Sequence, residues 1–528
     1  MICGRIPQRD AASRWIVVFI VLLTLAFHLW GIQRNLPYTA EVDEHFFVLP
    51  AVRIASSGNL NPGWFGHPGS TITYPLAGVY HVWNAVAHRG TLFRLDPNLQ
   101  VNFDANPSEF YLLGRLLTSL YSALSVPFVY LVGRRVFGRR VALAGSFLSV
   151  FVPIVALYAQ YVRTDTAATF FGMVSVWLCL RTYDRPTMAN NVMAGFVIGL
   201  SISTRYFMVA LVPLLIAANA AHLWQRSPSF RGVIARLRGA TAGSLVAVLG
   251  FGLSTPYFFL DFPAALKSLS EEAESAHLGM DGLSTLGNIA WYLREAIPQN
   301  MTWPEAILAA VGAGLIVWRR QTAQLLLLWF VLVVLFGTSL SALHGHRWMF
   351  QIIPVLALFV ADTLSLIVRF ISARLQMSLV AGRALFLLAV LLVAVWPLSQ
   401  VVLYHVTQMN PTRVQAREWI VQNLPAKSRI LQEWYAAALG GTDFDVTERA
   451  VLAAGPTLDD YYREGYRYLV ASNYMYSRVL LEPERYRAQA AFYDALFNEE
   501  RLLKRFDPAF DLGGPIIEIY ELRERPPK

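Results

Sequence analysis

Residues 15–45 read WIVVFIVLLTLAFHLWGIQRNLPYTAEVDEH, an apolar run followed within a few residues by three carboxylates. The apolar run is long enough to cross a bilayer as a helix. The carboxylates Glu41, Asp43 and Glu44 stand directly outside it, where charge is costly unless it has a use. This stretch predicts a membrane protein with a group of acidic side chains at one face of the bilayer.

The residues after His45 favour a short interfacial helix. In FFVLPAVRIASSG the apolar side chains recur mostly at helical spacing, and the pattern stops at Gly58. Asp43 and Glu44 would then occupy the first turn, where the positive end of the helix dipole stabilises carboxylates. Asp43 is either a functional carboxylate or the N-cap of this helix, and spacing alone favours neither role.

The composition of the whole chain is that of a polytopic membrane protein: 55% of its 528 residues are apolar and 15% are charged. The two cysteines, Cys3 and Cys179, are too few and too badly placed for a disulfide framework. The net charge of +9 does not indicate a nucleic-acid partner, because the arginines fall in short loops without an accompanying aromatic patch. We interpret these arginines as signals of membrane topology.

About eleven apolar segments of roughly 20 residues each are expected to span the membrane. No small-residue cleavage site follows the first segment, so we expect an uncleaved helix with a cytoplasmic N-terminus. Under strict alternation every basic cluster, such as GRRVFGRR at 133–140, then falls on the cytoplasmic side. The expected spans are 15–31, 110–131, 141–158, 166–180, 191–204, 206–223, 240–259, 301–318, 325–343, 348–368 and 384–403.

Two regions outside the spans have a distinct character. The loop 32–107 is predicted to be external, and a loop of this length usually carries function. The composition becomes that of a soluble protein after Tyr404, which predicts a membrane domain at 1–404 and a small extracytoplasmic α/β domain at 405–528. Its expected helices are 412–423, 458–465 and 483–497, and its expected strands are 466–471 and 515–522.

Polar side chains that border the expected spans gather on the external face. Charged groups at membrane depth are costly and usually mark a functional cavity. Each arginine alone is also compatible with snorkelling, in which the guanidinium group reaches the headgroups, but three together favour a site. Besides the acidic stretch, the gathered residues are Arg163, Asp165, Arg205, His344, His346 and Arg347.

Several stretches, taken in their order along the chain, resemble the polytopic glycosyltransferases of the C-type (GT-C) fold. The likeness is strongest to the protein O-mannosyltransferase and aminoarabinose transferase branch, which is glycosyltransferase family 39, and it covers roughly residues 15–370. One departure is HRWMF, where many relatives have Arg followed by Tyr. The stretches are VDEH at 42–45, YAQYVRTDTAATFF at 158–171, STRYFMVALVPLL at 203–215, TPYFFLDFP at 255–263 and HRWMFQIIP at 346–354, with a looser likeness in REWIVQNLP at 417–425.

The resemblance implies transfer of mannose or a similar hexose from a polyprenyl-phosphate donor to an extracytoplasmic acceptor, with inversion at the anomeric carbon. The residue types fit this chemistry. A glycoside hydrolase needs two carboxylates, one of them an acid for a poor leaving group. A polyprenyl monophosphate leaves without such an acid once cations neutralise it. One base and a cationic cluster therefore suffice.

Roles for the candidate residues follow from this chemistry. Asp43, with Glu44 beside it, is the expected catalytic base for the acceptor hydroxyl. Arg205 and Arg347 are expected to bind the donor phosphate, for which the guanidinium fork is well suited, with His344 or His346 adding hydrogen bonds.

The remaining candidates have open roles. Asp165 either positions the acceptor, shares a divalent ion with Asp43, or pairs with Arg163 as a structural salt bridge. Glu41 and His67 are acceptor-side or structural residues. His67 begins HPGSTITYPLAG at 67–78, which predicts either a second interfacial helix or a structural re-entrant turn. No spacing of His and carboxylates demands a metal, so we predict no required metal or cofactor, although a divalent ion is compatible with the site.

Other classes of protein fit the sequence less well. A secondary transporter would show repeated halves, and the sequence has no internal repeat. A non-catalytic scaffold would not need the acidic and arginine clusters. An oligosaccharyltransferase of the same fold usually has a Trp-Trp-Asp motif, and this chain has no Trp-Trp pair. The predicted partners are a polyprenyl-linked sugar, a protein, lipid or glycan acceptor and the lipid bilayer. The predicted location is the plasma (inner) membrane.

Overall fold

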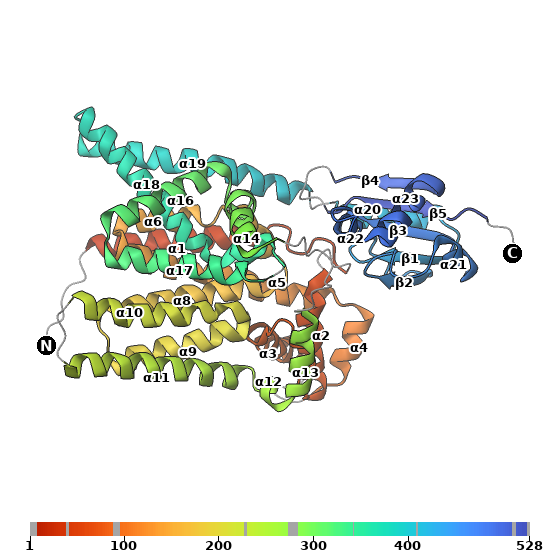
Figure 1. Cartoon of the computed structure of the whole chain (residues 1–528), viewed down its shortest axis with the longest axis horizontal. Helices are drawn as coiled ribbons and strands as arrows, with labels where there is room; N and C mark the ends of the chain where they lie inside the picture. The colour runs from red at the N-terminus through yellow and green to blue at the C-terminus, as the bar shows by residue number, and fades with distance from the viewer. Residues whose placement is uncertain are drawn as a thin grey trace. The chain divides into compact units, whose positions relative to one another are not determined.

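The structure is a computed structural model of the chain, and it describes residues 8–37, 42–87, 95–225, 230–272, 283–341, 343–407, 410–508 and 514–524 (Figure 1). The chain divides into two compact units. The first contains Met1–Ile32, His45–Glu274 and Leu283–Val401, and the second contains Gln33–Glu44, Ser275–Gly282 and Val402–Lys528.

The first unit is a bundle of long helices that lie side by side (Figure 1). Within the described ranges, six helices are long and apolar enough to cross a membrane. The chain is therefore a multi-pass membrane protein, while the count of eleven spans stays a prediction. The six helices are α1 (Gln8–Leu29), α5 (Ser108–Val136), α11 (Phe230–Ser254), α17 (Thr322–Ser339), η4 with α18 (His346–Ile352 and Ile353–Arg374) and α19 (Leu379–Thr407).

Shorter helices complete the first unit. Those that carry or support the candidate residues are α2 (His45–Ser57), α3 (Ser70–Ala87), α8 (Thr164–Asp184), α9 (Met188–Thr204), η2 (Tyr206–Ala210), α14 (Thr285–Trp291), the π-helix η3 (Tyr292–Ala296) and α15 (Ile297–Met301). The others are α4 (Asn98–Ala105), α10 (Leu211–Gln225), α12 (Tyr257–Leu260), α13 (Phe262–Glu272) and α16 (Trp303–Arg319).

Helices α9 and α11 meet backbone to backbone. A Cβ on Gly195 of α9 would collide with the carbonyl oxygen of Gly243 on α11. A Cβ on Gly250 of α11 would lie 2.9 Å from the carbonyl oxygen of Phe196 on α9. Small residues at such a seam let membrane helices approach closely, so glycine at these positions allows α9 to pack directly on the backbone of α11.

The segment 141–158, expected as one span, is interrupted. It forms α6 (Arg139–Leu148) and α7 (Pro153–Tyr158), separated by a turn. Val152 before the proline is extended, with φ −63° and ψ 120°. Proline disfavours a helical conformation in the preceding residue and has no N–H to donate, so the helix restarts at Pro153.

Helices are present at the two stretches where interfacial helices were expected, with two corrections, and their location at the interface stays a prediction. Helix α2 ends at Ser57 and Gly58 follows with φ +74°, as predicted. Asp43 and Glu44 do not lie in its first α-helical turn but in the 3₁₀ turn η1 (Val42–Glu44) just before it. The second interfacial helix, α3, extends to Ala87 rather than ending at residue 78, because the residues after Gly78 continue to pack on the core.

The second unit contains a five-stranded sheet in the order β2-β1-β3-β5-β4. β1 pairs in parallel with β2 and β3, whereas β5 is antiparallel to β3 and β4. The strands are β1 (Arg429–Glu433), β2 (Asp445–Arg449), β3 (Tyr468–Ser472), β4 (Arg501–Phe506) and β5 (Ile517–Glu521). The helices are α20 (Thr412–Asn423), α21 (Leu458–Arg463), α22 (Asn473–Leu480) and α23 (Arg487–Glu499).

A carboxylate is buried at the end of β1. Glu433 accepts hydrogen bonds from the backbone N–H groups of Leu452, at 3.1 Å, and Ser472, at 2.7 Å. The hydroxyl of Tyr493 also donates to it. Burial raises the pKa of the Glu433 carboxyl from its usual 4.5 to about 7, despite these donors.

This carboxyl makes the stability of the second unit depend on pH. The unfolded chain releases the proton near pH 4.5 and the folded unit holds it until about pH 7, so the folded state binds more protons in between. The free energy of unfolding should therefore fall as the pH rises through this window, by about 3 kcal/mol in total. Thermal unfolding between pH 4.5 and 8 measures it. Glu433→Gln should flatten the profile, and parallel profiles for variant and wild type would contradict the assignment.

Candidate functional site

The centre of the candidate site is a buried carboxylate between two arginines. Asp165 lies in the first turn of α8 and is 1% exposed. Arg163 is the N-cap residue of α8, and its Nε lies 3.8 Å from Oδ2 of Asp165. Arg205 follows the last residue of α9 and forms a salt bridge through Nη1 with Oδ1. Two buried guanidinium groups therefore stand beside one carboxylate.

This geometry supports the structural interpretation of Asp165 and extends it. The sequence suggested Arg163 as the partner of Asp165, and the structure adds Arg205, which is 40 residues further along the chain and also buried. Both arginines have an extended backbone, because Arg163 precedes the first residue of α8 and Arg205 follows the last residue of α9. Arg205 is therefore held in place by Asp165 rather than directed at the interface.

Aromatic rings connect the two arginines to η4. Each guanidinium group lies over one ring, and each of these rings contacts an aromatic residue of η4. Arg347 belongs to the same 3₁₀ turn and is partly buried, so it lies on the element that packs against the cluster. The two series of contacts are Arg163–Tyr158–Phe350, with 5.4 and 6.4 Å to the ring centroids, and Arg205–Phe207–Trp348, with 4.6 and 6.5 Å.

The two histidines before α18 pack on a tryptophan that the sequence analysis did not identify. The ring centroid of Trp291 lies 4.0 Å from that of His344 and 4.8 Å from that of His346. His344 Nδ1 lies 3.1 Å from Oδ1 of Asn288, and Nδ2 of Asn300 donates to the carbonyl oxygen of His346 at 2.6 Å. These contacts hold η4 from the side of α14 and α15. The only sequence signal for them was the polar and aromatic content of residues 288–300.

The acidic stretch lies in the second unit. Asp43 is partly buried and Glu44 is fully buried in the 3₁₀ turn η1. Glu41 falls outside the described residues. The carboxylates precede His45, the first residue of α2, so the chain connects them directly to the first unit.

A hollow of about 310 Å³ opens beside the first turn of α2. The rings of Phe46 and Trp64 stack in it at 4.6 Å, and Trp64 meets the ring of His67 edge-on at 5.4 Å. A concave surface with aromatic walls and a few polar groups is the common form of a small-molecule site. His67 is thus connected to the first turn of α2 through the rings of Trp64 and Phe46. The lining is completed by His45, Leu49, Pro50, Arg53, Pro62 and Gln100.

The site shows no cluster of metal ligands in the part of the chain that the structure describes, where no three His, Cys, Asp or Glu side chains are placed to hold an ion. Asp165 has its two arginine partners instead. That no metal or cofactor is required stays a prediction.

Comparison with known proteins identifies related sequences. Residues 112–251 match the profile of the dolichyl-phosphate-mannose-protein mannosyltransferase family. A curated relative from Pseudomonas fluorescens, undecaprenyl phosphate-alpha-4-amino-4-deoxy-L-arabinose arabinosyl transferase 1, is 27% identical over 350 residues. The match covers 62% of this chain and 59% of that relative, so the chain matches less than two thirds of the relative's length.

Two solved structures share the fold. The archaeal oligosaccharyltransferase AglB from Archaeoglobus fulgidus, in complex with an inhibitory peptide and a dolichol-phosphate, matches with a TM-score of 0.53 and 12% identity, over 98% of this chain and 75% of that one. ArnT from Cupriavidus metallidurans, in the apo state, matches with a TM-score of 0.51 and 15% identity, over 96% of this chain and 98% of that one. These comparisons confirm the resemblance that the sequence motifs predicted.

Proposed function

We propose that this chain is a glycosyltransferase of the C-type fold, of the aminoarabinose transferase and protein mannosyltransferase type, to which it is similar in sequence and fold. The chain transfers a sugar from a polyprenyl-phosphate donor to an acceptor hydroxyl. The observation that carries the proposal is the buried cluster of Asp165, Arg163 and Arg205, whose aromatic neighbours contact η4, the element that carries Arg347. The names of the relatives, which include undecaprenyl and dolichyl phosphates, support this class of donor.

In the proposed reaction the acceptor oxygen attacks the anomeric carbon from the face opposite the phosphate. The bond from the anomeric carbon to the phosphate oxygen breaks, and the configuration inverts. Polyprenyl phosphate leaves as an anion that the cationic cluster stabilises. The acceptor proton passes to Asp43, which becomes the neutral acid. A base positioned in this way contributes on the order of 10² to 10⁴ in rate.

The arginines have different tasks in this proposal. Asp165 already takes up much of the charge of Arg205, so Arg205 and Arg163 supply a fixed positive potential. Arg347 contacts the phosphate directly, with His344 and His346 as neighbouring donors. Hydrogen bonds between charged partners are roughly twice as strong as neutral ones, which makes Arg347 the residue to test for donor binding.

Arg347→Ala should weaken binding of undecaprenyl phosphate about tenfold or more, because it removes a charge-assisted contact worth roughly 1.5 to 3 kcal/mol. The measurement is a titration of the purified protein with undecaprenyl phosphate, followed by thermal unfolding or native mass spectrometry. Arg374→Ala is the matched control, since this exposed arginine lies at the other end of α18, over the ring of Phe370. Equal affinity in the two variants would remove Arg347 from the donor site.

The relatives suggest two different donor sugars. A hexose such as mannose fits the matching family, whereas the curated relatives are named for an aminoarabinose. Protection of the protein against thermal unfolding by polyprenyl phosphomannose or by undecaprenyl phospho-aminoarabinose separates the two donors. For the acceptor we keep the protein, lipid and glycan hydroxyls predicted from the sequence.

We place the chain in the inner membrane with its N-terminus in the cytoplasm and its second unit outside, because the basic loops then share the cytoplasmic side. An alkaline phosphatase fused after Lys528 should be active. The same reporter inserted after Gln376, between α18 and α19, should be silent. The reverse pattern would contradict the proposed orientation.

A further inference from the structure

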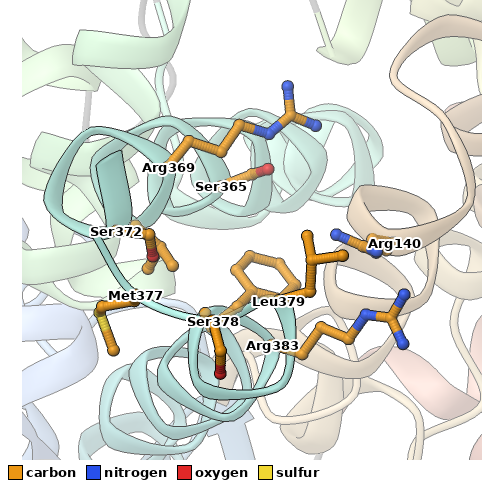
Figure 2. A pocket seen from close by; sticks show the side chains of 11 residues that line it. Arg140, Ser365, Arg369, Ser372, Met377, Ser378, Leu379 and Arg383 are labelled. Carbon is orange, nitrogen blue, oxygen red and sulfur yellow. The ribbon is translucent and has the colours of Figure 1, made fainter. Parts of the chain in front are cut away.

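A second pocket, of about 390 Å³, lies in the first unit, and none of its lining residues belongs to the candidate site. Figure 2 shows the side chains that line it. It is enclosed by the last turns of α18, the first turns of α19 and the start of α6. Helix α18 begins at Ile353, directly after η4, and reaches Arg369 sixteen residues later. At 1.5 Å per residue this is about 24 Å, most of the thickness of a hydrocarbon core. The pocket therefore lies near the membrane face opposite η4.

Three arginines contribute to the lining: Arg140 on α6, Arg369 on α18 and Arg383 on α19 (Figure 2). Among the described residues, none of the three guanidinium groups is hydrogen-bonded or within 4.0 Å of a carboxylate oxygen. By contrast, Arg319 on the neighbouring α16 is paired with Asp362 at 2.7 Å. The lining also has no acidic residue. Three like charges in one pocket repel each other, so an anion would lower the energy of this arrangement.

Other groups at the pocket are also donors. The hydroxyl oxygen of Ser372 is buried and has no hydrogen-bond partner in the described part of the chain. Gly382 lets α19 approach it, because a Cβ there would lie 3.0 Å from that hydroxyl. Helix α6 begins with Arg139 and Arg140 and has no side-chain N-cap, so the positive end of its dipole adds to the potential.

The pocket continues into a surface that suits acyl chains. Val368, Leu379 and Phe386 line it beside the arginines. Leu379 is 78% exposed, and outward-facing leucines follow along α19 at Leu387, Leu388, Leu391 and Leu392. A soluble anion would use the arginines and leave this apolar side uncovered. A lipid would use both, since its head group is charged and its chains are apolar.

We propose that this pocket binds an anionic phospholipid of the leaflet opposite the candidate site. The phosphodiester lies among Arg140, Arg369 and Arg383 and accepts the hydrogen bond of Ser372, and the acyl chains follow the exposed leucines of α19. The proposal does not depend on the reaction proposed above, because it uses other residues at the other end of α18.

The test is native mass spectrometry of the full-length protein in detergent, titrated with dioleoylphosphatidylglycerol or dioleoylphosphatidylcholine. The wild type should retain phosphatidylglycerol in preference to phosphatidylcholine. The variant Arg140→Gln/Arg369→Gln/Arg383→Gln should bind phosphatidylglycerol at least tenfold more weakly. The control Arg181→Gln/Arg238→Gln/Arg320→Gln removes the same charge from three exposed arginines that do not line the pocket, and it should bind like the wild type. Equal affinity in the two triple variants would overturn the proposal.

A second arm separates a lipid from a soluble anion. Inorganic phosphate and glycerol 3-phosphate should not displace phosphatidylglycerol at a hundredfold excess, because they lack the chains. If either soluble phosphate displaced phosphatidylglycerol at a concentration equal to that of the lipid, the ligand would be a soluble phosphate and the proposal would be overturned. If the triple variant does not fold, Gly382→Leu serves instead, since it keeps all three arginines and directs a side chain towards Ser372. It should weaken phosphatidylglycerol binding at least threefold, and unchanged binding would count against the pocket.

Discussion

Asp43→Asn is expected to lower the rate of sugar transfer by a factor on the order of 10² to 10⁴, with little change in donor binding or in the thermal unfolding of the protein. The amide has nearly the shape of the carboxylate and should preserve the 3₁₀ turn η1, in which Asp43 lies before α2 and does not cap it. It cannot accept the proton of the acceptor hydroxyl. Turnover with a saturating donor, measured beside the affinity for undecaprenyl phosphate, separates loss of the base from loss of the site.

Two further variants check this assignment. Asp43→Ser keeps a side-chain oxygen without a basic group, so it should be as inactive as the asparagine variant. Glu44→Gln tests the fully buried neighbour in the same 3₁₀ turn. Near-normal turnover in either Asp43 variant would identify Asp43 as a structural residue, and the base would then be sought at Glu44, Glu41 or Asp165.

Asp165→Asn should destabilise the first unit by about 3 to 5 kcal/mol, because it leaves two buried arginines without their carboxylate. The loss is measured as a lower midpoint of thermal unfolding in detergent. Glu271→Gln is the matched control: it removes a carboxylate from the exposed Lys267–Glu271 pair, which is worth less than about 1 kcal/mol.

A double variant tests whether the pairing itself carries this stability. Asp165→Asn/Arg205→Gln removes one charge of each sign and should recover part of the loss, because residues in direct contact do not act additively. A single variant as stable as the wild type would show that Asp165 is not held by the arginines. Asp165 would then be available for the acceptor or for an ion.

The sequence was informative where one local pattern determines the result. Long apolar runs predicted the six described helices that are long and apolar enough to cross a membrane, and Thr412–Asn423 is observed with the predicted bounds. Pro153 indicates an interruption of the helix, but the continuous apolar pattern around it favoured a single span. Strands β1, β2 and β4 were missed because each is short and rich in charged residues. β4 has no alternation of buried and exposed positions.

The sequence indicated which residues are candidates for the site, but it did not indicate which of them contact each other. Charges at the ends of spans indicated that Arg163, Asp165 and Arg205 belong to one face. The bond between Asp165 and Arg205 joins the start of α8 to the end of α9, and no local pattern contains it. The packing of His344 and His346 on Trp291 likewise depends on how α14 and η4 meet. Such contacts are set by the tertiary fold.

Because α9 and α11 meet at glycines, a substitution at this contact could inactivate the protein although it lies far from the site. Gly195 precedes Arg205 by ten residues of one helix, about 15 Å. A larger side chain there would push α9 away from α11 and carry its final turn with it, shifting the guanidinium group relative to Asp165. A screen for inactive variants would therefore classify Gly195 with the residues that contact the substrate. The cause of inactivity would instead be a displacement of Arg205 at the end of α9.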